Sequence, residues 1–169
     1  MTDIRIREAS ETDIPTMQDI ADRSYLVAYR GIHSEEQNLY MKNMMYSTES
    51  LLEQMRTGSR FFLVYANETA TGYCAIKPVA GEPDVIYIDK LYVLPDMKFK
   101  GFGKALIERV LEEAGKRDNI SIIRLDVNRS NPSIAFYKSF GFTTKREWDA
   151  PIGNGYEMNA VTMEKSLRN

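Results

Sequence analysis

The sequence is poor in the residues that form disulfides and transition-metal sites. Its 169 residues include one cysteine, Cys74, and one histidine, His33. A single cysteine excludes an internal disulfide and a cysteine-based metal site, and a single histidine disfavours a histidine-ligated metal. We therefore expect no metal cofactor. Cys74 lies in an apolar run and is expected to be buried and unreactive. His33 is interpreted as a loop or helix-entry residue, with a base on the substrate side as the alternative.

The sequence also lacks a dominant charge and a long apolar run. Its 22 lysines and arginines nearly balance its 24 aspartates and glutamates, so no strongly basic stripe suggests nucleic acid binding. No run of 18 apolar residues predicts a membrane span, and residues 1–10 lack the apolar segment of a signal peptide. We therefore expect a cytoplasmic protein without nucleic acid or membrane partners. The length predicts one domain spanning residues 1–169.

Apolar residues recur with periods that switch between those of strands and those of helices. A period of two, or a short apolar run, predicts a strand, and a period near 3.6 predicts an amphipathic helix. The predicted strands are residues 3–9, 61–66, 72–76, 84–94, 121–127, 142–148 and 156–165. The predicted helices are residues 10–30, 34–45, 48–56, 103–117 and 131–141. From residue 84 onward the order strand–helix–strand–helix implies parallel pairing within a mixed sheet, so the fold class is α/β.

Lysines alternate with aromatic residues and glycines in "KFKGFGK", residues 98–104, where a helix is about to begin. A Walker loop is excluded because Ala105 follows Lys104 and Lys98 replaces the first glycine. The dinucleotide fingerprint is excluded because Leu106 replaces its third glycine. A helix N-terminus with nearby glycines and lysines still favours an anion such as a diphosphate. A solvated turn with lysines kept for solubility is the alternative.

A second motif, "NPSIAFYKSFGF", occupies residues 131–142. Together with "KFKGFG", the opening "IRIREASETDIPTM" and the order of elements, it resembles the GNAT superfamily of acetyl-CoA-dependent N-acetyltransferases over nearly the whole chain. Within that superfamily, "YIDKLYV" followed by "NPSIAFYK" is most similar to the diamine (spermidine/spermine) and PaiA-like branch. The resemblance implies a mixed, mostly antiparallel sheet of seven strands with a V-shaped opening between the fourth and fifth. A homodimer is a further expectation.

The resemblance implies acetyl-CoA as co-substrate and assigns residues to it. The strand is expected to widen irregularly near residues 91–93, so that its main chain meets the pantetheine and thioester. The loop that follows is expected to hold the diphosphate through main-chain N–H groups. The expected cofactor-binding residues are Leu91, Tyr92, Val93, Lys98, Phe99, Lys100, Gly101, Phe102, Gly103, Lys104, Ser130 and Asn131.

Two of these positions depart from the family pattern. Lys98 stands where an arginine or glutamine is usual, which main-chain binding of the phosphates should tolerate. The usual asparagine seven residues before the tyrosine is replaced by Ser130, with Asn131 one residue later. Asn131 precedes Pro132 and is equally suited to capping a helix, so both roles stay open.

Acetyl transfer to an amine needs a base, because an alkylammonium loses its proton only near pH 10.4. Asp89 matches the acidic residue proposed as that base in the diamine branch, and a salt bridge to a nearby cation is its alternative. A base acting through water, with help from Tyr87, is a variant. Simple alternation would place Tyr87, Asp89 and Leu91 on one face of their strand. Tyr137 matches the tyrosine that protonates the CoA sulfur, and a core aromatic is its alternative.

The acceptor is expected to be a small primary amine, with a polyamine as the first hypothesis. Tyr25, Tyr29 and Tyr87 are the expected substrate-binding residues. Carboxylates that could attract a polyamine are Glu35, Glu36, Glu82, Asp84 and Asp89. An amino acid, a peptide N-terminus and an antibiotic amine are alternatives, and a CoA-binding sensor without catalysis is the alternative of another class.

Overall fold

The computed structural model describes residues 2–28 and 34–168, with residues 25–28 described by their backbone alone. The strands are β1 (Ile4–Glu8), β2 (Arg60–Ala66), β3 (Thr69–Val79), β4 (Glu82–Val93), β5 (Ile122–Asn128), β6 (Thr143–Gly153) and β7 (Tyr156–Ser166). The α-helices are α1 (Ile14–Ala28), α2 (Glu35–Tyr46), α3 (Thr48–Arg56), α4 (Phe102–Gly115) and α5 (Ser133–Ser139). Short 3-10 turns, Glu11–Asp13 and Pro95–Met97, precede α1 and follow β4.

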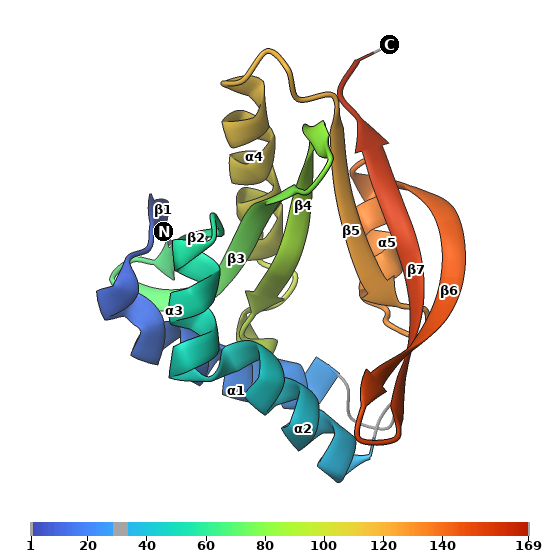
Figure 1. The fold of residues 1–169 in the computed structure, drawn as a ribbon. Helices are drawn as coiled ribbons and strands as arrows, with labels where there is room; N and C mark the ends of the chain where they lie inside the picture. The colour runs from blue at the N-terminus through green and yellow to red at the C-terminus, as the bar shows by residue number, and fades with distance from the viewer. Residues whose placement is uncertain (1, 29–33, 169) are drawn as a thin grey trace.

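The strands form one seven-stranded sheet in the order β1-β2-β3-β4-β5-β7-β6 (Figure 1). The β4–β5 pair is parallel, and the other five pairs are antiparallel. The predicted mixed, mostly antiparallel sheet is therefore confirmed. The parallel pair arises because α4 carries the chain from the end of β4 back to the start of β5, as a βαβ crossover requires.

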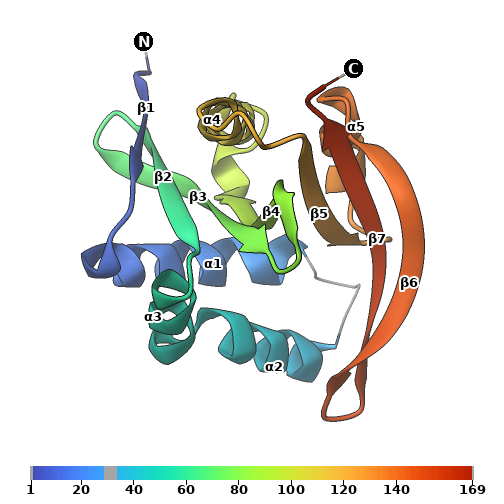
Figure 2. The same cartoon turned by 45° about the horizontal axis from the view of Figure 1, so that its top comes forward.

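Helices cover both faces of the sheet (Figure 2). On one face, α4 packs on β2, β3 and β4 through a core that includes Leu106, Ile107 and Val110. On the other face, α1–α3 pack on β2 and β3 through a second core that includes Met17 and Leu51. Two cores on opposite faces are what short strands with apolar residues on both sides produce. Cys74 is fully buried, and burial raises the pKa of its thiol to about 12, as expected for an unreactive core cysteine.

β4 contains one residue more than its partner strand. Ala75 lies opposite Lys90 and Ile76 lies opposite Ile88, so Asp89 between them has no partner in β3. An extra residue of this kind is a β-bulge, which bends its strand and reverses the faces of the side chains on either side of it. The predicted irregularity near residues 91–93 is therefore wrong, because these residues keep a regular register with β3 and the extra residue is Asp89.

The bulge also makes the predicted alternation wrong. Ile88 packs in the core beneath α4, together with Leu91 and Val93. Lys90 lies on the other face, with its ammonium 5.5 Å from the ring centroid of Tyr46. Uninterrupted alternation would have put Ile88 and Lys90 on the same face. Tyr87, before the bulge, and Lys90, after it, therefore lie on the same face of β4, whereas uninterrupted alternation would put them on opposite faces.

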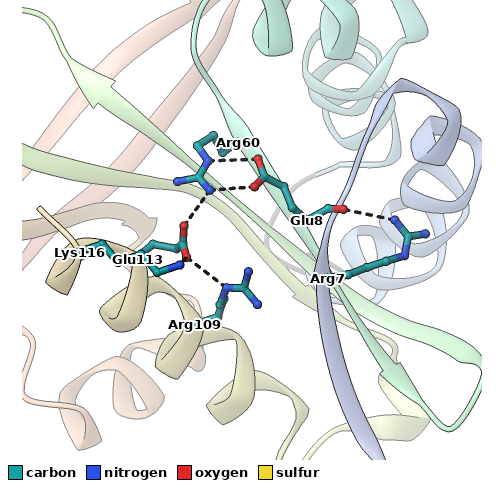
Figure 3. Close-up of polar contacts among 6 residues, drawn as sticks. All are labelled: Arg7, Glu8, Arg60, Arg109, Glu113 and Lys116. Carbon is teal, nitrogen blue, oxygen red and sulfur yellow. Dashed lines mark hydrogen bonds and ion pairs between the residues drawn. The ribbon is translucent and has the colours of Figure 1, made fainter.

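An ion cluster joins β1, β2 and α4 (Figure 3). The carboxylate of Glu113 is almost fully buried and lies 2.7 Å from Arg60 Nη2, 3.4 Å from Arg109 Nε and 2.8 Å from Lys116 Nζ. Arg60 in turn forms two hydrogen bonds to Glu8, at 2.8 and 3.1 Å. Burying a carboxylate costs free energy unless cations pair with it. Here three cations surround the Glu113 carboxylate and offset that cost. This cluster attaches the C-terminal end of α4 to β1 and β2.

None of the helices in the described ranges is long and apolar enough to cross a membrane.

Candidate active site

The sheet opens between its fourth and fifth strands. β4 and β5 pair only from Val85 with Ile122 to Ile88 with Leu125, although β4 continues to Val93 and β5 to Asn128. Beyond these pairs the two ribbons diverge (Figure 1). The predicted V-shaped opening is therefore confirmed. Because β4 stays paired to β3 through Val93, only its edge facing β5 is left for a ligand's hydrogen bonds.

Gly72 of β3, which lies opposite Val93 of β4, is required by the close packing of these two strands. A Cβ atom on Gly72 of β3 would lie 2.6 Å from the carbonyl oxygen of Tyr92. Real Cβ atoms do not approach a carbonyl oxygen that closely, so only glycine lets β3 approach β4 at this point. Gly72 thereby sets the position of residues 91–93, the segment expected to meet the thioester.

The loop before α4 has the geometry of an anion site. Gly101 precedes the helix with φ +93°, a left-handed conformation that favours glycine, and no side chain caps this helix start. Phe99 has φ +64° and a fully exposed side chain. A non-glycine residue in this conformation costs free energy and is typical of functional loops. Uncapped N–H groups of the first turn and the positive end of the helix dipole together favour a diphosphate here.

The other glycine of the loop has a packing role. Gly103 lies in the first turn of α4, where a Cβ atom would come within 3.2 Å of the ring of Phe136 in α5. This contact brings the start of α4 against the middle of α5 on the same face of the sheet. Lys104 forms a loose ion pair with Glu108, at 3.9 Å, and both side chains are exposed. Lys104 therefore remains available to an anion.

Asn131 caps α5. Its Oδ1 accepts hydrogen bonds from the main-chain N–H and the hydroxyl of Ser133, at 2.8 and 2.7 Å. The main-chain N–H of Ser130 donates to Oδ1 of the buried Asn128, at 2.9 Å. The capping role left open by the sequence is thus present, and contact of either residue with CoA stays a prediction.

Tyr137 lies on α5 and is 7% exposed. Its ring packs edge-on against Phe136 and Phe142, with centroids 5.3 and 5.8 Å away. The main-chain N–H of Phe142 donates to the carbonyl of Tyr137, at 3.2 Å, which ties the end of the helix to the turn before β6. The ring is therefore held rigidly on the face of the sheet that carries α4. Its role as the acid stays a prediction.

Asp89, at the bulge, is bracketed by two lysines. Its carboxylate lies 2.6 Å from Lys90 Nζ and 3.7 Å from Lys77 Nζ. Lys90 is 3% exposed and also donates to Gln54 Oε1, at 2.5 Å. Burial lowers the pKa of the Lys90 ammonium, and attraction to Asp89 opposes that change. Asp89 thus makes the salt bridge that was the alternative to catalysis, while its place at the start of the opening suits a base.

A cavity of about 440 Å³ lies on the face of the sheet opposite α4 and α5. Tyr87 lines it and donates a hydrogen bond to Asp126 Oδ2, at 2.7 Å. Burial and then this hydrogen bond raise the pKa of the Tyr87 phenol far above its ordinary value, so the phenol stays protonated. Tyr87 therefore acts as a donor at neutral pH and cannot itself remove a proton from an amine. Its predicted role in binding the acceptor stays a prediction.

Sequence reasoning missed Asp126 and Arg146, which also line the cavity. The signal for Asp126 is the alternation of Arg124, Leu125 and Asp126 within a central strand, where both faces should be apolar. Among the other predicted substrate residues, Tyr25 lies in α1 but its side chain is not described. Tyr29 and His33 lie outside the described residues.

These features agree with one protein family. A model of the acetyltransferase (GNAT) family matches residues 15–142, and the chain belongs to this family. A relative named spermidine N(1)-acetyltransferase, from Thermoplasma acidophilum, is 32% identical over 145 residues, which cover 82% of this chain and 88% of that protein. The chain is accordingly an acyltransferase of the GNAT type.

Solved structures show the same fold. The PaiA N-acetyltransferase from Thermoplasma acidophilum, in complex with coenzyme A, has a TM-score of 0.81 and 28% identity, covering 97% of this chain and 99% of that one. A GCN5-related N-acetyltransferase from Rhodopseudomonas palustris has a TM-score of 0.82 at 24% identity, covering 99% and 98%. The second likeness concerns the fold alone. The first was determined with coenzyme A, which agrees with acetyl-CoA as the co-substrate of this family.

Proposed function

We propose that this protein transfers the acetyl group of acetyl-CoA to the primary amine of a small molecule, by direct attack in a ternary complex. The observation that carries the proposal is the loss of β4–β5 pairing immediately before Asp89. The opening gives a thioester access to the β4 main chain from the side of α4 and α5. The cavity gives an amine access from the other side.

The residues have the following proposed roles in the reaction. The ammonium loses its proton to Asp89, directly or through a water molecule, because at neutral pH an alkylamine is almost entirely protonated. The amine nitrogen then bonds to the thioester carbon, and main-chain N–H groups at residues 91–93 stabilise the oxyanion. When the carbon–sulfur bond breaks, Tyr137 donates its proton to the departing CoA thiolate. The second proton of the attacking nitrogen passes through water to restore the Tyr137 hydroxyl, so the products are the acetylated amine, free CoA and the one proton released from Asp89.

CoA is proposed to bind at the start of α4. The main-chain N–H groups of the first turn and of the loop 98–101 would hold the diphosphate, and the exposed ring of Phe99 would pack on the cofactor. Lys98, Lys100 and Lys104 would add charge. Asn131 and Ser130 lie at the start of α5, the helix that packs against α4 through Gly103, and so lie on the same face of the sheet.

A polyamine is the first candidate acceptor. It is supported by the relative named spermidine N(1)-acetyltransferase. An amine that belongs to an amino acid or a peptide end is the second candidate. It is favoured by the charges at the cavity, where arginines as well as carboxylates line the wall. Two carboxylates considered for a polyamine already have a cationic partner: Asp89 pairs with Lys90, and Glu82 pairs with Arg124, which it shares with Glu164.

Release of free CoA thiol from acetyl-CoA, measured with spermidine, spermine, lysine and peptide N-termini, tests the proposal. Acetylation of at least one amine with saturation in both substrates is expected. Tight binding of CoA without turnover of any amine would instead support a sensor. A cytoplasmic location, a homodimer and the absence of a metal stay predictions from the sequence.

A further inference from the structure

The cavity is built from two rows of residues that face one another across the strands. In the first row, Tyr87 of β4 lies opposite Arg124 of β5, which lies opposite Glu164 of β7. In the second row, Asp126 of β5 lies opposite Thr162 of β7, which lies opposite Arg146 of β6. All six residues line the cavity. Each row therefore carries its side chains on one face of the sheet, about 4.8 Å apart from strand to strand.

The first row contains one cation, Arg124, which two carboxylates share. Arg124 Nη1 lies 2.7 Å from one carboxylate oxygen of Glu82, and Arg124 Nε lies 2.7 Å from Glu164 Oε2. A second contact to Glu82, at 3.0 Å, makes that pair bidentate. A guanidinium held by two carboxylates has no charge left for a ligand. The first row therefore forms a wall of the cavity.

The second row contains a carboxylate held by neutral groups. Asp126 accepts hydrogen bonds from the hydroxyls of Tyr87 and Thr162. Thr162 in turn accepts a hydrogen bond from the indole N–H of Trp148, at 2.8 Å. Within the described ranges, no lysine or arginine lies within ion-pair distance of Asp126. The hydrogen bonds hold the carboxylate in place, and none of the described cations compensates its negative charge.

The same row ends in a cation held by an aromatic ring. The guanidinium of Arg146 lies 5.5 Å from the ring centroid of Trp148, within range of a cation–π interaction. No carboxylate in the described part of the chain pairs with Arg146. Trp148 thus orients both ends of the row, since it stacks on Arg146 and donates to Thr162, which donates to Asp126.

We propose that the second row binds an acceptor that carries an anionic group besides its amine. The ammonium lies at Asp126 and a carboxylate lies at Arg146, so the acceptor is an amino acid or a molecule with the same two charges. Asp126 directly follows Leu125, the last residue of β5 that pairs with β4. The amine therefore lies beside the opening, and the carboxylate lies two strands farther away, about 10 Å between main chains. This inference rests on the proposed function and decides between its two candidates.

Charge decides against an unmodified polyamine in this position. Its second ammonium would lie beside the guanidinium of Arg146, which is exposed, and two like charges side by side repel. An acceptor carboxylate in that place forms a bidentate pair with the guanidinium instead. The preference should therefore depend on the carboxylate alone.

The experiment compares lysine with 1,5-diaminopentane, which is lysine without its carboxylate. Trp148 is the only tryptophan of the chain, so its fluorescence reports binding at the cavity without any need for turnover. With CoA present, the wild type should bind lysine at least about 10-fold more tightly than the diamine, a factor that corresponds to one ion pair. In Arg146→Gln this ratio should fall to near 1. In Asp126→Asn both ligands should bind more weakly.

Arg56→Gln is the matched control, because it removes the same charge from an exposed site on α3. It should keep the wild-type ratio. A ratio that stays the same in Arg146→Gln, or a wild type that prefers the diamine or shows no fluorescence response to either ligand, would overturn the inference. Acetylation of spermidine with unchanged rate in Arg146→Gln would also overturn it while leaving the proposed function intact. The expected ratios without acetylation of any amine would overturn the proposed function and leave the carboxylate subsite supported.

Discussion

Lys90 Nζ lies 2.6 Å from the carboxylate of Asp89, although the two residues are neighbours in a strand, where adjacent side chains normally point to opposite faces. The bulge at Asp89 makes this contact possible. A buried ammonium, itself held by Gln54, thereby orients the carboxylate that stands at the start of the opening. The ion pair explains how the Asp89 side chain keeps a fixed orientation at the edge of β4 where the substrate is proposed to bind.

Replacement of Asp89 by asparagine keeps the size of the side chain and removes the base. We expect kcat to fall about 10²- to 10⁴-fold, the range for loss of a general base, while the dissociation constant for CoA stays unchanged. Steady-state kinetics and calorimetric CoA titration measure the two quantities. Lys90→Met is the companion variant: it should lower kcat by less, because Asp89 loses its orientation and not its charge. An Asp89→Asn variant with wild-type kcat would exclude Asp89 as the base.

Replacement of Tyr137 by phenylalanine removes one oxygen and leaves the ring packing against Phe136 and Phe142 in place. If Tyr137 protonates the thiolate, kcat should fall about 10²-fold or more. The thermal midpoint should change little. Phe140→Leu, on the same helix end, serves as a control that perturbs packing alone and should leave kcat close to wild type. Unchanged kcat in Tyr137→Phe would make Tyr137 a core aromatic, the alternative weighed from the sequence.

Gly72→Ala should destabilise the protein, because the added Cβ would lie 2.6 Å from the carbonyl oxygen of Tyr92. Forcing β3 and β4 apart should cost about 1–3 kcal/mol of unfolding free energy, the usual cost of overpacking. Urea unfolding measures this. Gly115→Ala, at the end of α4, is the matched control: its Cβ would meet nothing within 4 Å, so the change should be neutral or slightly stabilising. Equal effects of the two substitutions would contradict the close approach.

Acid should weaken the fold through the carboxylates paired with arginines. Hydrogen bonds from Arg60 lower the pKa of Glu8. Burial alone would raise the pKa of Glu113, but hydrogen bonds from Lys116 and Arg60 hold it below the ordinary 4.5. Since the folded-state pKa values lie below the unfolded ones, this stability is fully present above about pH 4.5 and is lost as pH falls through the folded-state pKa values.

Urea midpoints measured between pH 6 and pH 3 test this. The midpoint should be flat near pH 6 and should fall steadily below the ordinary glutamate pKa. In Glu8→Gln the slope should be shallower, since one of the groups that bind protons on unfolding is missing. Glu113→Gln should be less stable at pH 6 and should lose less on acidification. A slope identical to wild type in Glu8→Gln would show that its pKa is not lowered by folding.

Local patterns predicted much of this protein. The order of strands and helices, the loop at 98–104 and the capped start of α5 all follow from residues close together in the chain, where periodicity and turn chemistry act. The bulge at Asp89 did not follow, because only the register with β3 shows that residues 75–76 span three residues of β4. The second row of the cavity did not follow either. Asp126, Thr162 and Arg146 meet because β7 pairs with both β5 and β6, which no local pattern of residues reveals.

The extra residue at position 89 has a consequence for how this strand can change. In a strand, adding or removing one residue exchanges inside and outside for everything on one side of it. Asp89 is the extra residue of a bulge, so a chain without it would instead leave Ile88 and Lys90 as neighbours opposite Ile76 and Ala75, each on the face that it already occupies. Substitutions at position 89 alter the chemistry of one side chain, whereas a deletion there would make β4 regular and remove both the bulge and the carboxylate at the start of the opening.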